Sequence, residues 1–184
     1  MNYTIQVAGL ERELTLFPVS DTLSIAGFVI FGDVELTRAA AKGLLEKAPE
    51  FDIILTAEAK AIPLAYEMAS QAGQNDYVIA RKSIKAYMDD VISTTVNSIT
   101  TQGTQTLYLG GNDVEKLKGK RVLIVDDVIS TGGSLASLQQ LAKLAGANVV
   151  ASMAILAEGD AIERTDITVL GQLPLFNPDG SIKE

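Results

Sequence analysis

The 184-residue sequence contains no cysteine and no histidine. The lack of cysteine excludes disulfides, thiolate metal sites and cysteine nucleophiles, and it is compatible with a reducing compartment. The lack of histidine removes every Ser-His or Cys-His pair, the usual zinc sites and the commonest general base. Any catalysis must therefore depend on carboxylates, backbone dipoles, lysine, arginine or a hard metal ion.

Positive charge is also scarce, because 15 Lys and Arg residues face 23 Asp and Glu residues, for a formal net charge of −8. A chain this acidic repels a phosphate backbone, so we expect no general nucleic-acid binding. No apolar run approaches the roughly 20 residues that span a bilayer. The N-terminal stretch MNYTIQVAGLERELTLF lacks the basic start and unbroken apolar segment of a signal peptide. We therefore expect a cytoplasmic protein without a membrane segment.

Strand and helix patterns alternate along the chain, and no repeat, low-complexity tract or linker divides it. The length predicts a single domain over residues 1–184. Periodicity predicts helices over 34–47, 63–73 and 134–145, and strands over 51–57, 76–81, 121–127 and 148–157. Three strand-helix-strand steps imply an α/β fold, an open parallel sheet with helices on both faces.

Two regions depart from this alternation. Residues 91–110 are rich in Thr, Val and Ile around Gly103, which predicts a long β-hairpin projecting from the sheet. The ends of the chain, 1–31 and 166–184, are strand-like and carry aromatic residues. We expect these ends to form a small hood over one end of a core that spans 32–165.

The stretch VLIVDDVISTGGS, residues 122–134, combines a buried strand, two acids and a loop of small residues. If 121–125 is a strand, Asp126 and Asp127 lie at its carboxyl end, where ligands bind in open α/β sheets. The following STGGS leads into a helix, so its amides, hydroxyls and helix N-terminus form an anion site. Carboxylates do not bind that anion. Sugar hydroxyls or a magnesium ion are their natural partners.

Other motifs explain only part of this stretch. The acids and glycines could simply end the strand in a turn. A Walker B strand would need a G-x-x-x-x-G-K-[ST] loop upstream, and the sequence contains none. A receiver-type acidic pocket would have its acids after an early strand and would not explain the phosphate loop, and a GxGxxG dinucleotide motif is absent.

VLIVDDVISTGGS resembles the phosphoribosyl pyrophosphate (PRPP) motif of type I phosphoribosyltransferases. The resemblance implies that Asp126 and Asp127 hold the ribose 2′ and 3′ hydroxyls. It also implies a Mg²⁺ cofactor bound through PRPP, with the same two acids as candidate ligands. The residues implied to bind the 5′-phosphate are Ser130, Thr131, Gly132, Gly133 and Ser134.

Two further segments resemble the same family. TAEAKAIPLA, residues 56–65, is similar to its pyrophosphate loop, with Lys60 as the basic member, although a solvated turn would look much the same. ARKSIKAYM, residues 80–88, is similar to the mobile-loop motif of adenine phosphoribosyltransferases. Basic residues of that motif reach the pyrophosphate, often across a dimer interface, and a homodimer is therefore expected; a solvated basic turn is the alternative. The implied pyrophosphate contacts are Ala57, Glu58, Ala59, Lys60 and Arg81, with Lys82 and Lys85 as further cations.

The base is chosen by a variable hood in this family. Phe28 and Val128 are candidates to sandwich a purine ring, because aromatic and apolar faces suit a flat heterocycle. Core packing is the alternative for Phe28. Enzymes for hypoxanthine and guanine usually carry a third acid in the phosphate loop, where this chain has Ser130. That residue resembles the adenine group, although the hairpin segment 99–109 lacks the Glu that adenine enzymes often have.

The resemblance implies a purine phosphoribosyltransferase that transfers ribose 5-phosphate from PRPP to a purine, with adenine favoured. The residues implied in catalysis are Asp126, Asp127, Lys60, Arg81, Lys82 and Lys85. The hairpin at 91–110 would close over the reactants. Xanthine phosphoribosyltransferases and the effector domain of the purine operon repressor share the pattern. A xanthine enzyme, a non-catalytic PRPP or purine sensor and a generic phosphosugar-binding domain therefore remain alternatives.

Overall fold

The computed structural model describes residues 1–97 and 104–183. Strands and helices alternate through its centre, and a short 3₁₀ helix, η1, follows the longest central strand. The elements are β1 (Asn2–Val7), β2 (Leu10–Ser20), β3 (Leu23–Ala26), α1 (Val34–Leu45), β4 (Ile53–Ala57), α2 (Ile62–Gln71), β5 (Val78–Ala80), β6 (Ile92–Asn97), β7 (Thr104–Leu109), α3 (Gly111–Leu117), β8 (Arg121–Ile129), α4 (Gly133–Leu144), β9 (Asn148–Glu158), η1 (Gly159–Glu163) and β10 (Thr168–Leu173). Within the two described ranges, no helix is both long enough and apolar enough to span a bilayer.

A five-stranded sheet forms the centre of the structure, in the order β10-β9-β8-β4-β5. Every neighbouring pair of strands in it is parallel. All of β4 is buried, and so are residues 122–125 of β8. Strands covered on both faces favour apolar residues at consecutive positions, which explains the runs IIL at 53–55 and VLIV at 122–125. The predicted open parallel sheet is confirmed.

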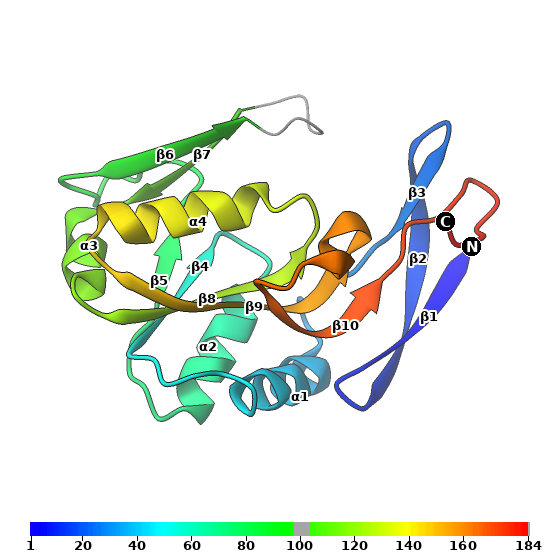
Figure 1. Cartoon of the computed structure of the whole chain (residues 1–184), viewed down its shortest axis with the longest axis horizontal. Helices are drawn as coiled ribbons and strands as arrows, with labels where there is room; N and C mark the ends of the chain where they lie inside the picture. The colour runs from blue at the N-terminus through cyan, green and yellow to red at the C-terminus, as the bar shows by residue number, and fades with distance from the viewer. Residues whose placement is uncertain (98–103, 184) are drawn as a thin grey trace.

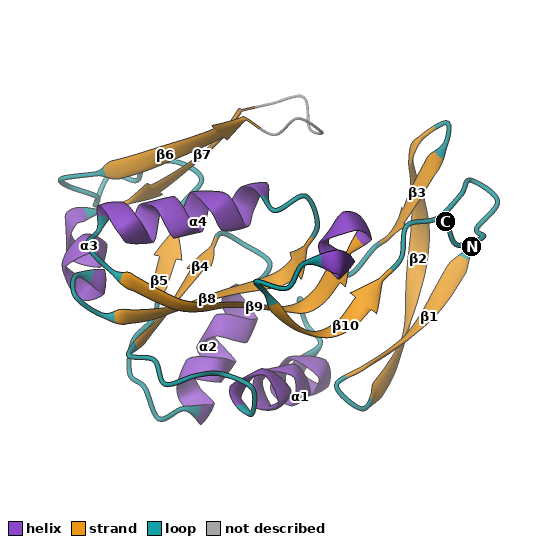
Figure 2. Ribbon diagram, viewed as in Figure 1, coloured by secondary structure: helices purple, strands orange, loops and turns teal. Residues whose placement is uncertain are grey.

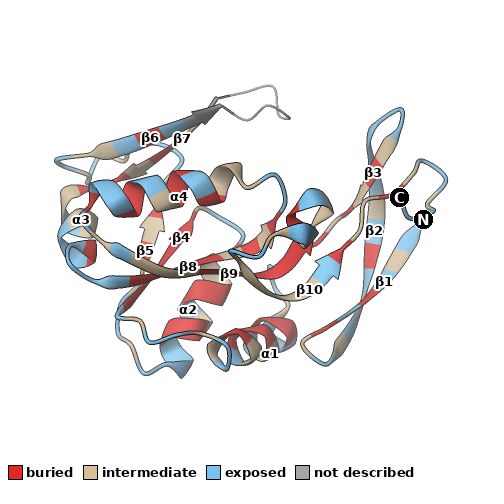
Figure 3. Cartoon of the chain, viewed as in Figure 1, coloured by how far each residue is buried: buried red, intermediate tan, exposed pale blue. Residues whose placement is uncertain are grey.

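Helices cover both faces of this sheet, as Figures 1 and 2 show: α1 and α2 lie on one side and α4 on the other. On α1 the buried residues Leu36, Ala40 and Leu44 recur every four positions and form one apolar face. Leu138 and Leu141 of α4 pack in a separate cluster against the opposite face of the sheet. Figure 3 shows buried residues along the central strands and on α1, α2 and α4.

Local signals explain where the helices begin. The Asp33 carboxylate accepts a hydrogen bond of 3.0 Å from the Leu36 N–H, which caps α1. Pro63 lies in the first turn of α2, where its missing N–H costs nothing. At the start of α4, Gly132 has φ +80°, a conformation that favours glycine.

The first three strands form a separate antiparallel sheet, β1-β2-β3, near both termini (Figure 1). Phe176 pairs with Ser24 of this sheet through two backbone hydrogen bonds of 2.8 and 3.0 Å. Arg12 ties the sheet to α1, because its Nε lies 2.6 Å from Asp33 Oδ2. The assignment of residues from 166 onward to the hood is wrong for β10, since β10 pairs in parallel with β9 in the central sheet.

The predicted hairpin is confirmed as β6 and β7, which pair from Ile92 and Leu109 to Asn97 and Thr104. The hairpin lies over α4, on the side away from the sheet (Figure 1). Leu107 and Leu109 of β7 are buried in the same cluster as α4. Residues 98–103 of the predicted hairpin lie outside the described residues. Closure of the hairpin over reactants stays a prediction.

Candidate functional site

The two adjacent acids lie near the carboxyl end of β8 and face different surroundings. Asp127 is 4% exposed, whereas Asp126 is partly exposed and lines a cavity with the following loop. Successive residues of a strand point to opposite faces, which explains the separation. The Asp126 Oδ1 also accepts a hydrogen bond of 2.9 Å from the Asp127 N–H. The pair therefore presents carboxylates to two sides of one strand end.

Lys60 is the partner of Asp127. Its Nζ lies 2.9 Å from Asp127 Oδ2, and the angle is poor for a hydrogen bond, so this oxygen has an ion-pair partner but no aligned donor. The contact joins the loop after β4 to the end of β8. Thr56 supports it, since its buried hydroxyl donates to the Val125 carbonyl at 2.7 Å and holds the two strand ends together.

Burial raises the pKa of Asp126, and the nearby Asp127 charge raises it further. An acid of this kind favours a cation or hydroxyl donors beside it, because they stabilise its charged form. The pKa of a third acid, Glu158 at the end of β9, is raised, mainly by burial. The Lys60 charge opposes this rise, and the Asp127 charge adds to it. The sequence interpretation missed Glu158. Its only signal there was its position at the carboxyl end of a predicted strand.

The loop after β8 forms a small polar cavity. Its volume is about 40 Å³, and since a water needs roughly 10–15 Å³, a phosphate-sized anion has room. In the described ranges, no side-chain hydrogen bond uses the hydroxyls of Ser130, Thr131 or Ser134. The first residues of α4 also line this cavity, and backbone N–H groups at a helix N-terminus are unpaired donors. The lining residues are Asp126, Val128, Ile129, Ser130, Thr131, Gly132, Gly133, Ser134 and Leu135.

Arg164, just after η1, lies beside Gly132 of this loop. A Cβ added to Gly132 would lie 2.5 Å from Arg164 Nη1. Asp166 holds the guanidinium through Nε at 2.9 Å and Nη2 at 2.6 Å, which leaves Nη1 directed at the loop. Sequence reasoning also missed Arg164, because the chain folds it beside the loop from 32 residues away.

The two segments expected to bind pyrophosphate lie together. Arg81 Nη2 is 3.2 Å from Glu58 Oε1, so the loop after β4 contacts the basic segment after β5. The Glu58-Ala59 peptide bond in this loop is cis. Lys82 is exposed, and the Lys85 ammonium donates to Ser83 Oγ at 2.6 Å. Among the described residues, neither lysine makes an ion pair.

Lys60 therefore pairs with Asp127, and Arg81 pairs with Glu58. Among the described residues, no cation of the basic segment makes an ion pair or hydrogen bond with Asp126 or Asp127. Ala57 ends β4, and Ala59 lies between Glu58 and Lys60 in the loop that follows. The structure thus brings together the acids, the phosphate loop and Lys60, and it brings the basic segment to Glu58.

The two residues predicted to contact the base, Phe28 and Val128, differ in burial. Phe28 is 5% exposed and packs in the core, so its ring faces are not available to a ligand. The alternative of core packing is confirmed, and the expectation that Phe28 sandwiches a base is wrong. In the same segment Phe31 is 53% exposed. Val128 is partly buried and lines the phosphate-loop cavity.

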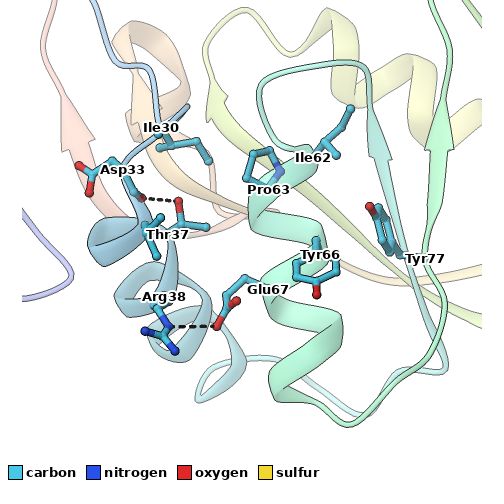
Figure 4. Close-up of a pocket in the computed structure, with 11 residues that line it drawn as sticks. Ile30, Asp33, Thr37, Arg38, Ile62, Pro63, Tyr66, Glu67 and Tyr77 are labelled. Atoms are coloured by element: carbon cyan, nitrogen blue, oxygen red, sulfur yellow. Dashed lines mark hydrogen bonds and ion pairs between the residues drawn. The ribbon is translucent and has the colours of Figure 1, made fainter.

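A second cavity, of about 420 Å³, lies between α1 and α2 (Figure 4). Ile30, Pro63 and Tyr66 give it an apolar lining, and Arg38 and Glu67 form an ion pair of 3.9 Å across one end. It contains none of the residues predicted for the site. Asp126 and the predicted phosphate loop line the smaller polar cavity instead.

Comparison with known proteins gives consistent similarities. The family model described as "Phosphoribosyl transferase domain" matches residues 34–172. The chain is 35% identical over 151 residues to the adenine phosphoribosyltransferase of Nocardia farcinica, which is 82% of this chain and 76% of that protein. It is 36% identical over 134 residues to the hypoxanthine/guanine phosphoribosyltransferase of Ferroglobus placidus, which is 72% of this chain and 67% of that protein.

Solved structures agree on the fold. The adenine phosphoribosyltransferase of Thermoanaerobacter pseudethanolicus superposes with a TM-score of 0.71 at 20% identity, covering 86% of this chain and 95% of that one. The similarity includes the parallel sheet and its helices.

Proposed function

The chain belongs to the phosphoribosyltransferase family, and we propose that this purine phosphoribosyltransferase transfers ribose 5-phosphate from PRPP to adenine, giving the nucleotide and pyrophosphate. The observation that carries the proposal is that a small polar cavity adjoins Asp126 at the same strand end where Lys60 pairs with Asp127. One ligand with a phosphate, a diol and a pyrophosphate would use all of these groups. We propose that residues 1–184 act as one domain.

The phosphate loop has the role of holding the 5′-phosphate. Residues 130–134 offer hydroxyls that make no side-chain hydrogen bond among the described residues, together with the N-terminal amides of α4, and Arg164 adds positive charge beside Gly132. Asp126 and Asp127 accept hydrogen bonds from the ribose hydroxyls. With the sugar fixed at both points, its C1 is held in one position relative to the incoming base.

Cations hold the departing pyrophosphate. Lys60 lies at the loop after β4, and Arg81 lies beside that loop through Glu58, which supports a pyrophosphate position between them. Lys82 and Lys85 add charge from the same segment. The transition state should be oxocarbenium-like, so fixed cations near the leaving group lower its energy by electrostatics. No step requires histidine, in agreement with the composition.

Magnesium is the proposed cofactor. In the described part of the chain, no cluster of three acids could enclose a metal by itself. Magnesium in proteins is usually held by one or two carboxylates together with substrate oxygens, and Asp126 and Asp127, with the Asp127 Oδ2 lacking an aligned donor, fit that donor set. When bound, the ion would neutralise charge on the pyrophosphate.

The choice of adenine rests on Ser130, which stands where hypoxanthine and guanine enzymes usually have an acid. Relatives of both groups are identical to this chain at about a third of the aligned positions, so base specificity is part of the proposal. We also propose a homodimer and a cytoplasmic location. Light scattering on the purified protein tests the dimer.

A panel of bases tests the proposed function. The protein is incubated with PRPP, Mg²⁺ and adenine, hypoxanthine, guanine, xanthine or orotate, and kcat/KM is measured for each. Adenine should give the highest value. Turnover of xanthine or guanine above adenine would overturn the specificity, and tight PRPP binding without turnover of any base would favour a sensor instead.

A further inference from the structure

Glu58 is unusual within a loop proposed to bind pyrophosphate, because a carboxylate repels an anion. The structure directs its side chain toward the basic segment instead. Oε1 lies 3.2 Å from Arg81 Nη2, and Oε2 accepts a hydrogen bond of 2.9 Å from the Lys82 N–H. Both oxygens of the carboxylate are therefore occupied by the segment that supplies cations.

The backbone around Glu58 joins three parts of the chain. The Glu58 N–H donates to the Ala80 carbonyl at 2.9 Å, which connects the loop to the end of β5. Arg81 exchanges two backbone hydrogen bonds of 2.9 Å with Tyr108 of the hairpin strand β7. The Glu58 carboxylate thus acts where the pyrophosphate loop, the basic segment and the hairpin meet.

The Arg81 guanidinium is oriented by two hydrogen bonds and keeps further capacity to donate. It donates through Nη2 to Glu58 and through Nη1 to the Tyr87 hydroxyl, and it lies 5.9 Å from the centre of the Tyr87 ring. Its Nε is buried without an acceptor among the described residues. The Lys82 N–H and then Arg81 lower the pKa of Glu58, which therefore stays charged at neutral pH.

We infer that Glu58 is a positioning residue, which holds Arg81 and the start of the basic segment against the pyrophosphate loop before PRPP binds. This inference rests on the proposed function, and it corrects the expectation that Glu58 itself contacts the pyrophosphate. A guanidinium held in place beforehand loses less conformational entropy when the anion binds. The energetic role of Glu58 is exerted through Arg81.

The first test is Glu58→Gln, which keeps the shape of the side chain and removes its charge. The Kd for PRPP with Mg²⁺, measured by calorimetry, should rise on the order of 10-fold, the typical cost of one charge-assisted hydrogen bond. KM for PRPP should rise in parallel, while kcat changes much less. The matched control is Glu50→Gln, an exposed glutamate 2.8 Å from Arg121 at the opposite end of β8, which should leave both values unchanged.

A double-mutant cycle separates positioning from a merely structural role. If Glu58 acts through Arg81, Glu58→Gln should add little to the loss already caused by Arg81→Gln. Fully additive losses, an unchanged Kd in Glu58→Gln, or tighter PRPP binding by this variant would each overturn the inference. A wild-type protein that binds no PRPP would instead overturn the proposed function, so the two failures are distinguishable.

Discussion

Replacing Gly132 by alanine should weaken both the fold and the phosphate loop, because two features of this position oppose a side chain. Its φ of +80° lies in the left-handed region, which costs a non-glycine residue about 1–2 kcal/mol. The new Cβ would also lie 2.5 Å from Arg164 Nη1, so the guanidinium would have to leave the loop or lose its contacts with Asp166.

The size of the effect follows from these two contributions. For a protein of this length, each kcal/mol lowers Tm by about 2–4 °C, so the backbone strain alone predicts a decrease of about 2–8 °C. A displaced loop also loses aligned N–H donors, and we expect affinity for ribose 5-phosphate to fall by on the order of 10-fold or more. Thermal unfolding and calorimetry measure the two effects on the same samples.

Gly119→Ala is the matched control. Gly119 has φ +71°, and a Cβ there would meet no atom within 4 Å, so this variant carries the backbone strain without the clash. It should lower Tm while leaving ribose 5-phosphate binding intact. Adding Arg164→Ala to Gly132→Ala should remove the clash and return part of the stability. Unchanged ribose 5-phosphate affinity in Gly132→Ala would refute the placement of the phosphate at this loop.

Phe28→Ala should destabilise the protein by about 3–5 kcal/mol, the usual cost of deleting a buried phenyl ring, which chemical denaturation measures. Phe31→Ala, the control in the same segment, should leave stability nearly unchanged because its ring is 53% exposed; a loss as large as that of Phe28→Ala would contradict the difference in packing. Asp52 accepts hydrogen bonds from Arg121, which lower the pKa of Asp52 from 3.8 to about 2. Its contribution to stability is therefore complete above pH 3.8 and is lost as the pH falls toward 2, so Asp52→Asn should flatten the acid side of a Tm profile, and an unaltered profile would contradict this.

Much of the central sheet was predictable because its strands carry their own signal. Residues 53–55 and 122–125 are apolar at consecutive positions, as is typical of strands buried on both faces, and the helix at 134–145 repeats leucine on one face. The acids and the glycine loop were likewise found from one contiguous segment. Where local sequence carries the physical requirement, as in these strands and this helix, the predicted elements are confirmed, and the roles of the acids and the loop stay predictions.

The errors came from contacts between distant segments. β10 is an edge strand of the central sheet, and most of its residues are only partly buried, as in the strands near the N-terminus. Only its pairing with β9 places it in the central sheet. Phe28 and Phe31 are three residues apart in a short segment, and only tertiary packing buries one and exposes the other. Arg164 and Glu158 reach the site through the fold, without a motif of their own.

The proposed function requires that one site joins a purine to the ribose of PRPP and releases pyrophosphate. The most direct test measures nucleotide and pyrophosphate together, in reactions with PRPP and Mg²⁺, with and without adenine. We expect both products in equal amounts, formed only when the base is present and lost in Asp127→Asn. Pyrophosphate release that does not depend on the base, or no product with any purine, would contradict it.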